Sequence, residues 1–136
     1  MSKLEDFKAP TTLKLSAAWA ATMFLYIYGD YFYMYVPGKL SAMAAGDLGV
    51  GHASDTLLLA VSIMMALPSL MIFLSLVLPR MLNKWLNVAL GLAYAAIVAM
   101  TMRGAPLFYL FFGSADVLMT LIIAWMALTW RKTPAA

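Results

Sequence analysis

Four long apolar stretches follow one another along the chain, separated by shorter polar segments. They lie at about 14–36, 56–78, 84–102 and 106–130. Each is close to the ~20 residues that an α-helix needs to cross the hydrocarbon core of a bilayer. Because backbone polar groups in lipid must find partners within their own segment, each stretch is predicted to be a helix. The pattern therefore predicts a single all-α domain over residues 13–132, a four-helix transmembrane bundle with antiparallel, up-down neighbours.

Residues that begin and end helices support these limits. Pro37 and Gly38 end the first stretch, because proline cannot continue the helical hydrogen bonds and glycine suits the position after a helix. Ser54 or Asp55 stands where the second helix needs an N-cap. The later links are short, whereas the first link is longer, and its segment 40–48 is expected to form a short interfacial helix.

Composition separates this chain from soluble proteins. Of its 136 residues, 65% are hydrophobic and 11% are charged, whereas a soluble domain carries about 25% charged residues. A soluble fold of this size could not bury so much apolar surface. The chain has no cysteine, which excludes disulfides and dithiol redox chemistry. The net charge of +3 comes from residues at helix ends, so it does not indicate nucleic-acid binding.

Lysine and arginine are unevenly divided between the two sides of the predicted bundle. Only Lys39 and Arg103 lie on one side, and seven lie on the other: Lys3, Lys8, Lys14, Arg80, Lys84, Arg131 and Lys132. Because short loops rich in these residues stay in the cytoplasm, both termini are predicted to be cytoplasmic, with tails at 1–12 and 133–136. Four tryptophans fall toward the same side, as in an interfacial aromatic belt: Trp19, Trp85, Trp125 and Trp130.

Asp30 places a carboxyl group inside the first predicted helix. Charge within the hydrocarbon region is costly and normally faces protein or water rather than lipid. Spacings of three and four put Asp30 on one helix face with residues expected to point into the bundle: Trp19, Met23, Tyr26 and Tyr33. Asp30 is therefore a candidate proton or cation site. The alternative is a buried anchor, paired with Arg103 or hydrogen-bonded to tyrosine hydroxyls.

Asp116 lies roughly midway along the fourth predicted helix, with Thr120 one turn later on the same face. In the second helix, Pro68 cannot donate to the Met64 carbonyl, which leaves that oxygen for a neighbour or a water. The alternative role for Asp116 is a neutral carboxyl that donates one structural hydrogen bond. Groups at similar depth predict a polar layer near the bilayer midplane: Asp116, Tyr26, Tyr94 and the Met64 carbonyl.

Metal and enzyme signatures are weak. Met34, Met43 and His52 fall near the outer side, but they lack regular ligand spacing, and methionine is usually a flexible core filler. The aromatic run at 108–112 indicates packing and lipid contact more than a quinone site. The chain has no nucleophile–base set, phosphate loop or metalloprotease motif. No catalytic residue, metal or cofactor is therefore predicted.

Three segments of the chain resemble a bacterial family of four-helix integral membrane proteins of unknown function, the DUF6326-like family, with DoxX-like architecture. They are YIYGDYFYMYVPG, ALPSLMIFLSLVLPRMLNKWLN and FYLFFGSADVLMTLIIAWMALTW, and the resemblance extends from Leu13 to Trp130. It implies a four-helix fold in the bacterial inner (plasma) membrane. In the family pattern the position of Asp116 is usually glutamate, and Ala66 stands where an acidic residue is common. The resemblance implies no activity.

Two classes of function stay open. The leading hypothesis is a small proton- or cation-linked transporter or channel-like protein that uses intramembrane carboxylates. The alternative is a non-catalytic membrane partner subunit, or a lipid- or quinone-binding module, with structural carboxylates. Because one small bundle encloses little room, a homo-oligomer surrounded by lipid is expected, without nucleic acid. The candidate binding residues are Asp30, Asp116, Tyr26, Tyr33, Tyr94, Thr120 and Arg103.

Overall fold

The computed structural model describes residues 7–131, and this part of the chain is helical, which confirms the prediction of an all-α protein. One isolated bridge, between Asp47 and His52, is the only strand-like pairing among these residues. Five helices follow one another: α1 (Thr11–Tyr33), α2 (Lys39–Ala44), α3 (Asp55–Val77), α4 (Arg80–Thr101) and α5 (Leu107–Leu128).

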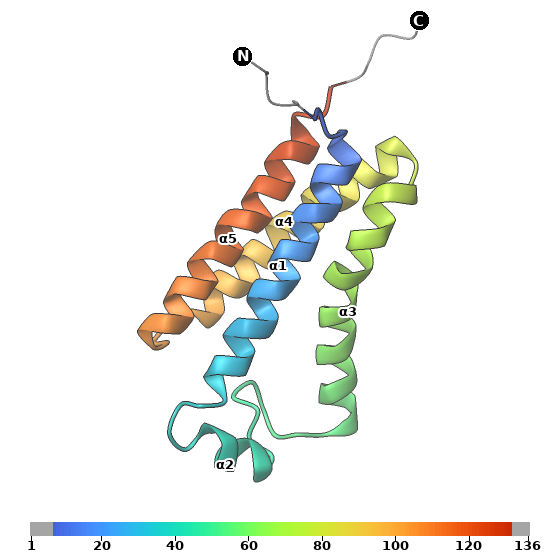
Figure 1. The fold of residues 1–136 in the computed structure, drawn as a ribbon. Coiled ribbons are helices and arrows are strands. Elements are labelled where there is room, and N and C mark those ends of the chain that lie inside the picture. The colour runs from blue at the N-terminus through green and yellow to red at the C-terminus, as the bar shows by residue number, and fades with distance from the viewer. Residues whose placement is uncertain (1–6, 132–136) are drawn as a thin grey trace, which may run out of the picture.

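Four of these helices have 22 or 23 residues and form a bundle, whereas α2 has six residues (Figure 1). We call the end of the bundle where α1 begins and α5 ends the Thr11 end. The opposite end, where α2 and its loops lie, is the α2 end. α1 and α4 run from the Thr11 end to the α2 end, and α3 and α5 run back. The short helix lies in the segment for which the sequence predicts one, and with it residues 7–131 contain five helices.

Three helices between residues 7 and 131 are long and apolar enough to cross a membrane: α3, α4 and α5. This finding is consistent with a membrane protein. α1 is as long as α3, but Lys14, Asp30 and several hydroxyl-bearing residues lower its mean hydropathy, and it is not one of the three. A fourth crossing by α1 stays a prediction.

The observed helices begin and end within four residues of the predicted limits, and the largest difference is at the start of α4. This helix begins at Arg80, directly after Pro79, rather than at 84. A proline just before the first turn loses no helical hydrogen bond, so the helix starts there. Asn83 is therefore inside a helix instead of in a link. Part of the predicted tail 1–12, its residues 1–6, and the predicted tail 133–136 lie outside the described residues.

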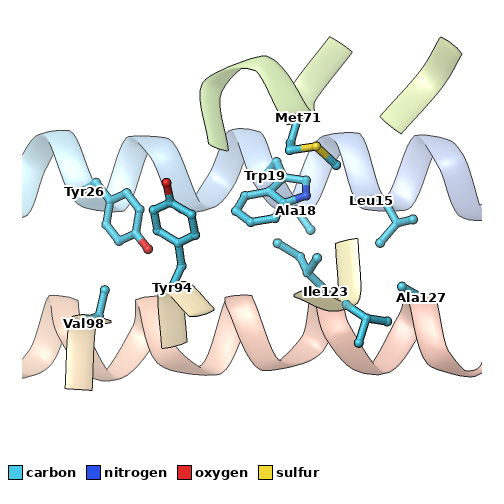
Figure 2. Packing of buried hydrophobic residues seen from close by; sticks show 10 residues of the cluster. Leu15, Ala18, Trp19, Tyr26, Met71, Tyr94, Val98, Ile123 and Ala127 are labelled. Atoms are coloured by element: carbon cyan, nitrogen blue, oxygen red, sulfur yellow. The ribbon is translucent and has the colours of Figure 1, made fainter. Parts of the chain in front are cut away.

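The core at the Thr11 end is packed without gaps to solvent, and Leu15, Trp19, Ile123 and Ala127 have no exposed surface (Figure 2). The assignment of Trp19 to an interfacial belt is therefore wrong. Its face of α1 points into the bundle, where the indole nitrogen finds a partner. Trp85 is 56% exposed, as a residue at a membrane interface can be.

α4 and α5 approach each other closely at Gly91. A Cβ atom placed there would lie 2.7 Å from the Thr120 carbonyl oxygen of α5 and 3.1 Å from the Cβ of Ala124. No real side chain fits at 2.7 Å from a backbone oxygen, so glycine is what allows this approach. Small residues play the same part in membrane helix packing generally.

A hydrogen-bonded group near the Thr11 end ties α1, α3 and α4 together. The Trp19 Nε1 donates to Asn87 Oδ1 at 2.7 Å, and Asn87 Nδ2 donates to Asn83 Oδ1 at 2.7 Å. Asn83 Nδ2 in turn donates to the backbone oxygen of Ser75 at 2.7 Å. None of these four residues has exposed surface. We call Trp19, Ser75, Asn83 and Asn87 the asparagine cluster.

α3 differs in its two halves. Its buried residues are Pro68, Met71 and Ser75, all in the second half. Figure 1 shows the helix changing direction about midway, where a proline removes one helical hydrogen bond and displaces the preceding turn. The half nearest the α2 end contributes no fully buried residue. Leu58, Leu59 and Ile63 face outward, whereas Met64 and Met65 are partly buried and pack against the core.

Candidate functional site

A cavity of about 90 Å³ lies between the four long helices, in the half of the bundle nearer the α2 end. Four of the predicted site residues line it together, from three helices. They are Tyr26 and Asp30 of α1, Tyr94 of α4 and Asp116 of α5. The cavity is roomy enough for water, because one water needs about 10–15 Å³ of such space.

Asp116 is the deepest polar group of the cavity. It lies nine residues into α5, about 13 Å from the start of the helix at 1.5 Å per residue. The residue is 4% exposed, and its Oδ1 atom is buried without a hydrogen-bond partner. Thr120 does not supply one, because its hydroxyl donates to the backbone oxygen of Asp116 at 2.8 Å. Threonine often bonds back to its own helix in this way.

Tyr26 supplies a second unpaired group at the same cavity. It is 8% exposed, and its hydroxyl is buried without a hydrogen-bond partner. Its ring lies beside that of Tyr94, with centroids 6.5 Å apart (Figure 2). Buried polar groups nearly always have partners, so two exceptions at one cavity require an explanation.

The Tyr94 hydroxyl already has a hydrogen-bond partner, because it donates to the Met64 carbonyl of α3. Pro68 leaves that carbonyl without its helical donor, so the structure provides the neighbour that the sequence predicts for it. The Tyr94 ring also stands edge-on to Trp19, with centroids 6.2 Å apart and planes at 85°. Tyr94 therefore contacts both the cavity and the asparagine cluster.

Asp30 lies where the cavity meets the molecular surface. It comes three residues before the end of α1, about 4–5 Å from it, and it is exposed while it also lines the cavity. An ion pair with Arg103 is not formed, so that alternative is wrong for this chain. Arg103 lies in the turn after α4, exposed to solvent and away from the cavity lining.

Tyr33 is not part of the cavity lining. Its ring packs against Tyr109 with centroids 5.4 Å apart, and the Lys39 ammonium lies 4.9 Å from its centroid. Its interaction with the Tyr33 side chain favours the charged form of the lysine and raises the pKa of Lys39. Tyr33 thus fastens the loop after α1 to the bundle.

Several lining residues are absent from the predicted site. Phe112 and Tyr109 add aromatic surface from α5, and Thr101 adds a hydroxyl near the end of α4. Gly29 and Gly113 leave room beside them: a Cβ on Gly29 would touch the Phe112 side chain at 3.5 Å. The signal for these residues was spacing, because Tyr109, Gly113 and Asp116 recur at intervals of four and three on one helix face.

The lining contains neither lysine, arginine nor histidine. Neither carboxyl group of the cavity makes a side-chain hydrogen bond or an ion pair anywhere in residues 7–131. In the same range, no three histidine, cysteine or acidic residues come together as metal ligands. The cavity therefore has two carboxyl groups and no basic side chain in its lining.

Comparison with known proteins identifies one family. The family model described as a family of unknown function (DUF6326) matches residues 3–136, nearly the whole chain. The chain belongs to that family. Among curated proteins and among solved structures, no match is found. The DUF6326 assignment thus agrees with the resemblance read from the sequence and brings no activity with it, and the DoxX-like architecture stays a prediction.

Proposed function

We propose that this DUF6326 protein is a multi-pass protein of the bacterial inner membrane, with α1, α3, α4 and α5 crossing and both termini in the cytoplasm. α1 supports a fourth crossing because it packs between α3 and α5 and matches their length. Cationic residues support the orientation. Lys39 and Arg103 lie near the α2 end, and five described cations lie near the Thr11 end: Lys8, Lys14, Arg80, Lys84 and Arg131.

The orientation can be tested directly, because the chain contains no cysteine. Val50 is 70% exposed in the loop at the α2 end, and Lys8 is exposed before α1. In intact cells, a thiol reagent that cannot cross the membrane should label the Val50→Cys variant and spare the Lys8→Cys variant. Labelling of Lys8→Cys alone would reverse the proposed topology.

We further propose that the cavity binds a proton or a small cation, which the protein moves across the membrane. The observation that carries this proposal is the pair of carboxyl groups, Asp30 and Asp116, which share one cavity without hydrogen bonds or a cationic neighbour. Intramembrane carboxyl groups with this placement typically mark ion pathways and proton relays. In this proposal, Asp30 at the surface and Asp116 further inside form two successive binding positions for a positive charge.

Transport requires a further step at the Thr11 end, because the bundle is closed there. Residues packed there, such as Leu15, Trp19 and Ile123, have no exposed surface, so an ion at Asp116 needs a rearrangement to continue. The first half of α3 lies at the α2 end, so it acts on the other side of the cavity: it contains no fully buried residue and is joined to the second half through the Pro68 bend. Movement of this half would open and close the cavity without disturbing the asparagine cluster.

Flux measurements test the transport proposal. Purified protein in liposomes should carry protons or monovalent cations at a rate that falls at least tenfold in the double variant Asp30→Asn/Asp116→Asn. Asp55→Asn is a matched control, because Asp55 is an exposed acid in the first turn of α3 that does not line the cavity. Equal flux from the wild type and the double variant, at several pH values, would refute the role of the two acids.

A second candidate function is a membrane partner subunit or a lipid- or quinone-binding module. The outward face of the first half of α3 favours it, since Leu59 is 61% exposed and Ile63 is 53% exposed. This function predicts that a second copy, another chain or tightly held lipid or quinone remains with the protein in mild detergent. Native mass spectrometry would reveal each of them, and a bare monomer without flux defects in the double variant would contradict both candidates.

A further inference from the structure

The free groups of the cavity are few, and they limit what can bind there. Thr101 donates to the Val98 carbonyl at 2.8 Å and accepts from the Tyr109 hydroxyl at 3.3 Å. The Tyr94 hydroxyl is bound to α3. Among the lining side chains, oxygen atoms without partners therefore come from only three residues: Asp30, Asp116 and Tyr26.

Three such residues provide too few oxygen ligands for an inorganic cation that has lost its water shell. Hard cations bind in cages of about six or more oxygen atoms, and each missing oxygen has to be supplied by water. The remaining wall offers few, because it is formed largely by thioethers, aliphatic side chains and aromatic rings, among them Met64, Ile97 and Phe112. An ion that gives up its water shell here would be under-coordinated.

An organic cation fits this chemistry better. Its charge is spread over methyl groups or a planar guanidinium, so it is weakly hydrated and loses less on entering an apolar wall. The rings of Tyr26, Tyr94 and Phe112 line the same cavity as the two carboxyl groups, and aromatic faces attract such cations within about 6 Å of their centroids. The wall and the acids together form one recognition site, in which the rings hold the body of the ion and the acids hold its charge.

The volume of the cavity sets a size limit. An apolar cavity of about 150 Å³ accepts benzene, which has six carbon atoms. At the same scale, the 90 Å³ cavity accommodates about four non-hydrogen atoms. We propose, building on the cation site of the proposed function, that the cavity selects a small organic cation of this size, a methylated ammonium or a guanidinium, over inorganic cations. Its entry passes Asp30, and its charge rests between Asp30 and Asp116.

Calorimetric titration of the purified protein in detergent tests this selectivity. The probes are trimethylammonium and guanidinium chloride. Urea serves as a neutral counterpart of guanidinium, tetrabutylammonium as an ion too large for the cavity, and sodium and potassium chloride as inorganic cations. Trimethylammonium or guanidinium should bind saturably and at least tenfold more tightly than sodium or potassium, and neither urea nor tetrabutylammonium should bind.

Two variants separate the roles of charge and ring. Asp116→Asn should weaken binding of the organic cation at least tenfold, whereas Asp55→Asn should leave it unchanged. Phe112→Leu keeps the apolar wall but removes one ring, and it should weaken the organic cation about three- to tenfold without affecting sodium. A thermal transition like that of the wild type shows that each variant is folded.

The outcomes distinguish this inference from the proposed function. Tighter binding of sodium or potassium than of either organic probe overturns the selectivity and leaves the cation site in place. Absence of any saturable binding, together with proton flux that depends on the two acids, also overturns it and leaves a proton site. Absence of binding with no effect of the acids on flux overturns both.

Discussion

The asparagine cluster and the cavity are both buried polar regions that involve α1, α3 and α4, and the cavity also includes α5. They differ in hydrogen bonding. In the asparagine cluster, each side-chain amide and the indole nitrogen have partners at 2.7–2.8 Å. In the cavity, Asp116 Oδ1 and the Tyr26 hydroxyl have none. A network with all its partners stabilises a packed interior, whereas one with missing partners is costly to keep.

This difference assigns stability to one region of the small bundle and binding to the other. The Thr11 end holds α1, α3 and α4 in fixed register through polar contacts that need nothing further. The α2 end keeps two carboxyl groups, Asp30 at the surface and Asp116 inside, that make no hydrogen bond to another side chain of the described residues. Because the two regions share α1 and α4, substitutions in each of them give a direct comparison, in which damage to the first should lower stability and damage to the second should alter binding.

The largest effect on stability is expected from Asn87→Leu. The change leaves the Trp19 indole nitrogen and the Asn83 side-chain oxygen without their partner, so the free energy of unfolding should fall by about 2–4 kcal/mol. Unfolding in mixed micelles, followed by circular dichroism, measures it. Ser69→Leu is the control, because Ser69 is exposed and bonds only to its own helix. Unchanged stability of Asn87→Leu would show that the cluster does not hold the helices.

A smaller loss is expected from Gly91→Ala, at the contact between α4 and α5. The added Cβ meets the Thr120 carbonyl at 2.7 Å, and forced overpacking of this kind costs about 1–3 kcal/mol. Ala93→Val, on an exposed position of the same helix, should change stability much less. The same unfolding assay compares the two variants, and equal stabilities would mean that the helices separate at little cost.

Tyr94→Phe should lower stability by about 1–2 kcal/mol, because the Met64 carbonyl loses its donor. In the background of Pro68→Ala the loss should become small, since residue 68 then has an N–H that can donate to the same carbonyl. A double-mutant cycle measures this coupling. If Tyr94→Phe has the same effect in both backgrounds, the tyrosine is not a substitute for the missing helical bond.

The smallest effect on stability is expected from Asp116→Asn. The carboxyl oxygen Oδ1 has no partner to lose, and a neutral amide is easier to bury than a charge, so the change should stay within about 1 kcal/mol in either direction. The same variant should lose cation binding. A fall in stability as large as that of Asn87→Leu would assign Asp116 to the structural framework and favour the partner-subunit function.

The sequence predicted the helices and four of the cavity residues for a common reason. Apolar length and helix-ending residues depend on local chemistry, and spacings of three and four place Tyr26 near Asp30 whatever the packing. The predicted surroundings were less accurate for three residues: Arg103, Tyr33 and Thr120. Their surroundings depend on a turn, on a loop, and on whether a threonine bonds to its own backbone, and these are decided by tertiary structure.

The asparagine cluster could also have been predicted from the sequence. Asn83 and Asn87 are four residues apart, so they share one face of an apolar helix. Polar amides on one face of a membrane helix usually bind another helix. The expected start of α4 at 84 hid this pair, because it placed Asn83 in a link.

The position of Tyr94 makes the intrinsic tryptophan fluorescence of the protein a reporter of the cavity. Its ring stands between Tyr26 of the cavity and Trp19, and Trp19 has no exposed surface, in contrast to Trp85 and Trp125. Indole emission depends on the surrounding electric field and on neighbouring rings. A chain that retains Trp19 alone, with its other tryptophans replaced by phenylalanine, should therefore change its fluorescence when the cavity fills, and so report occupancy without any attached dye.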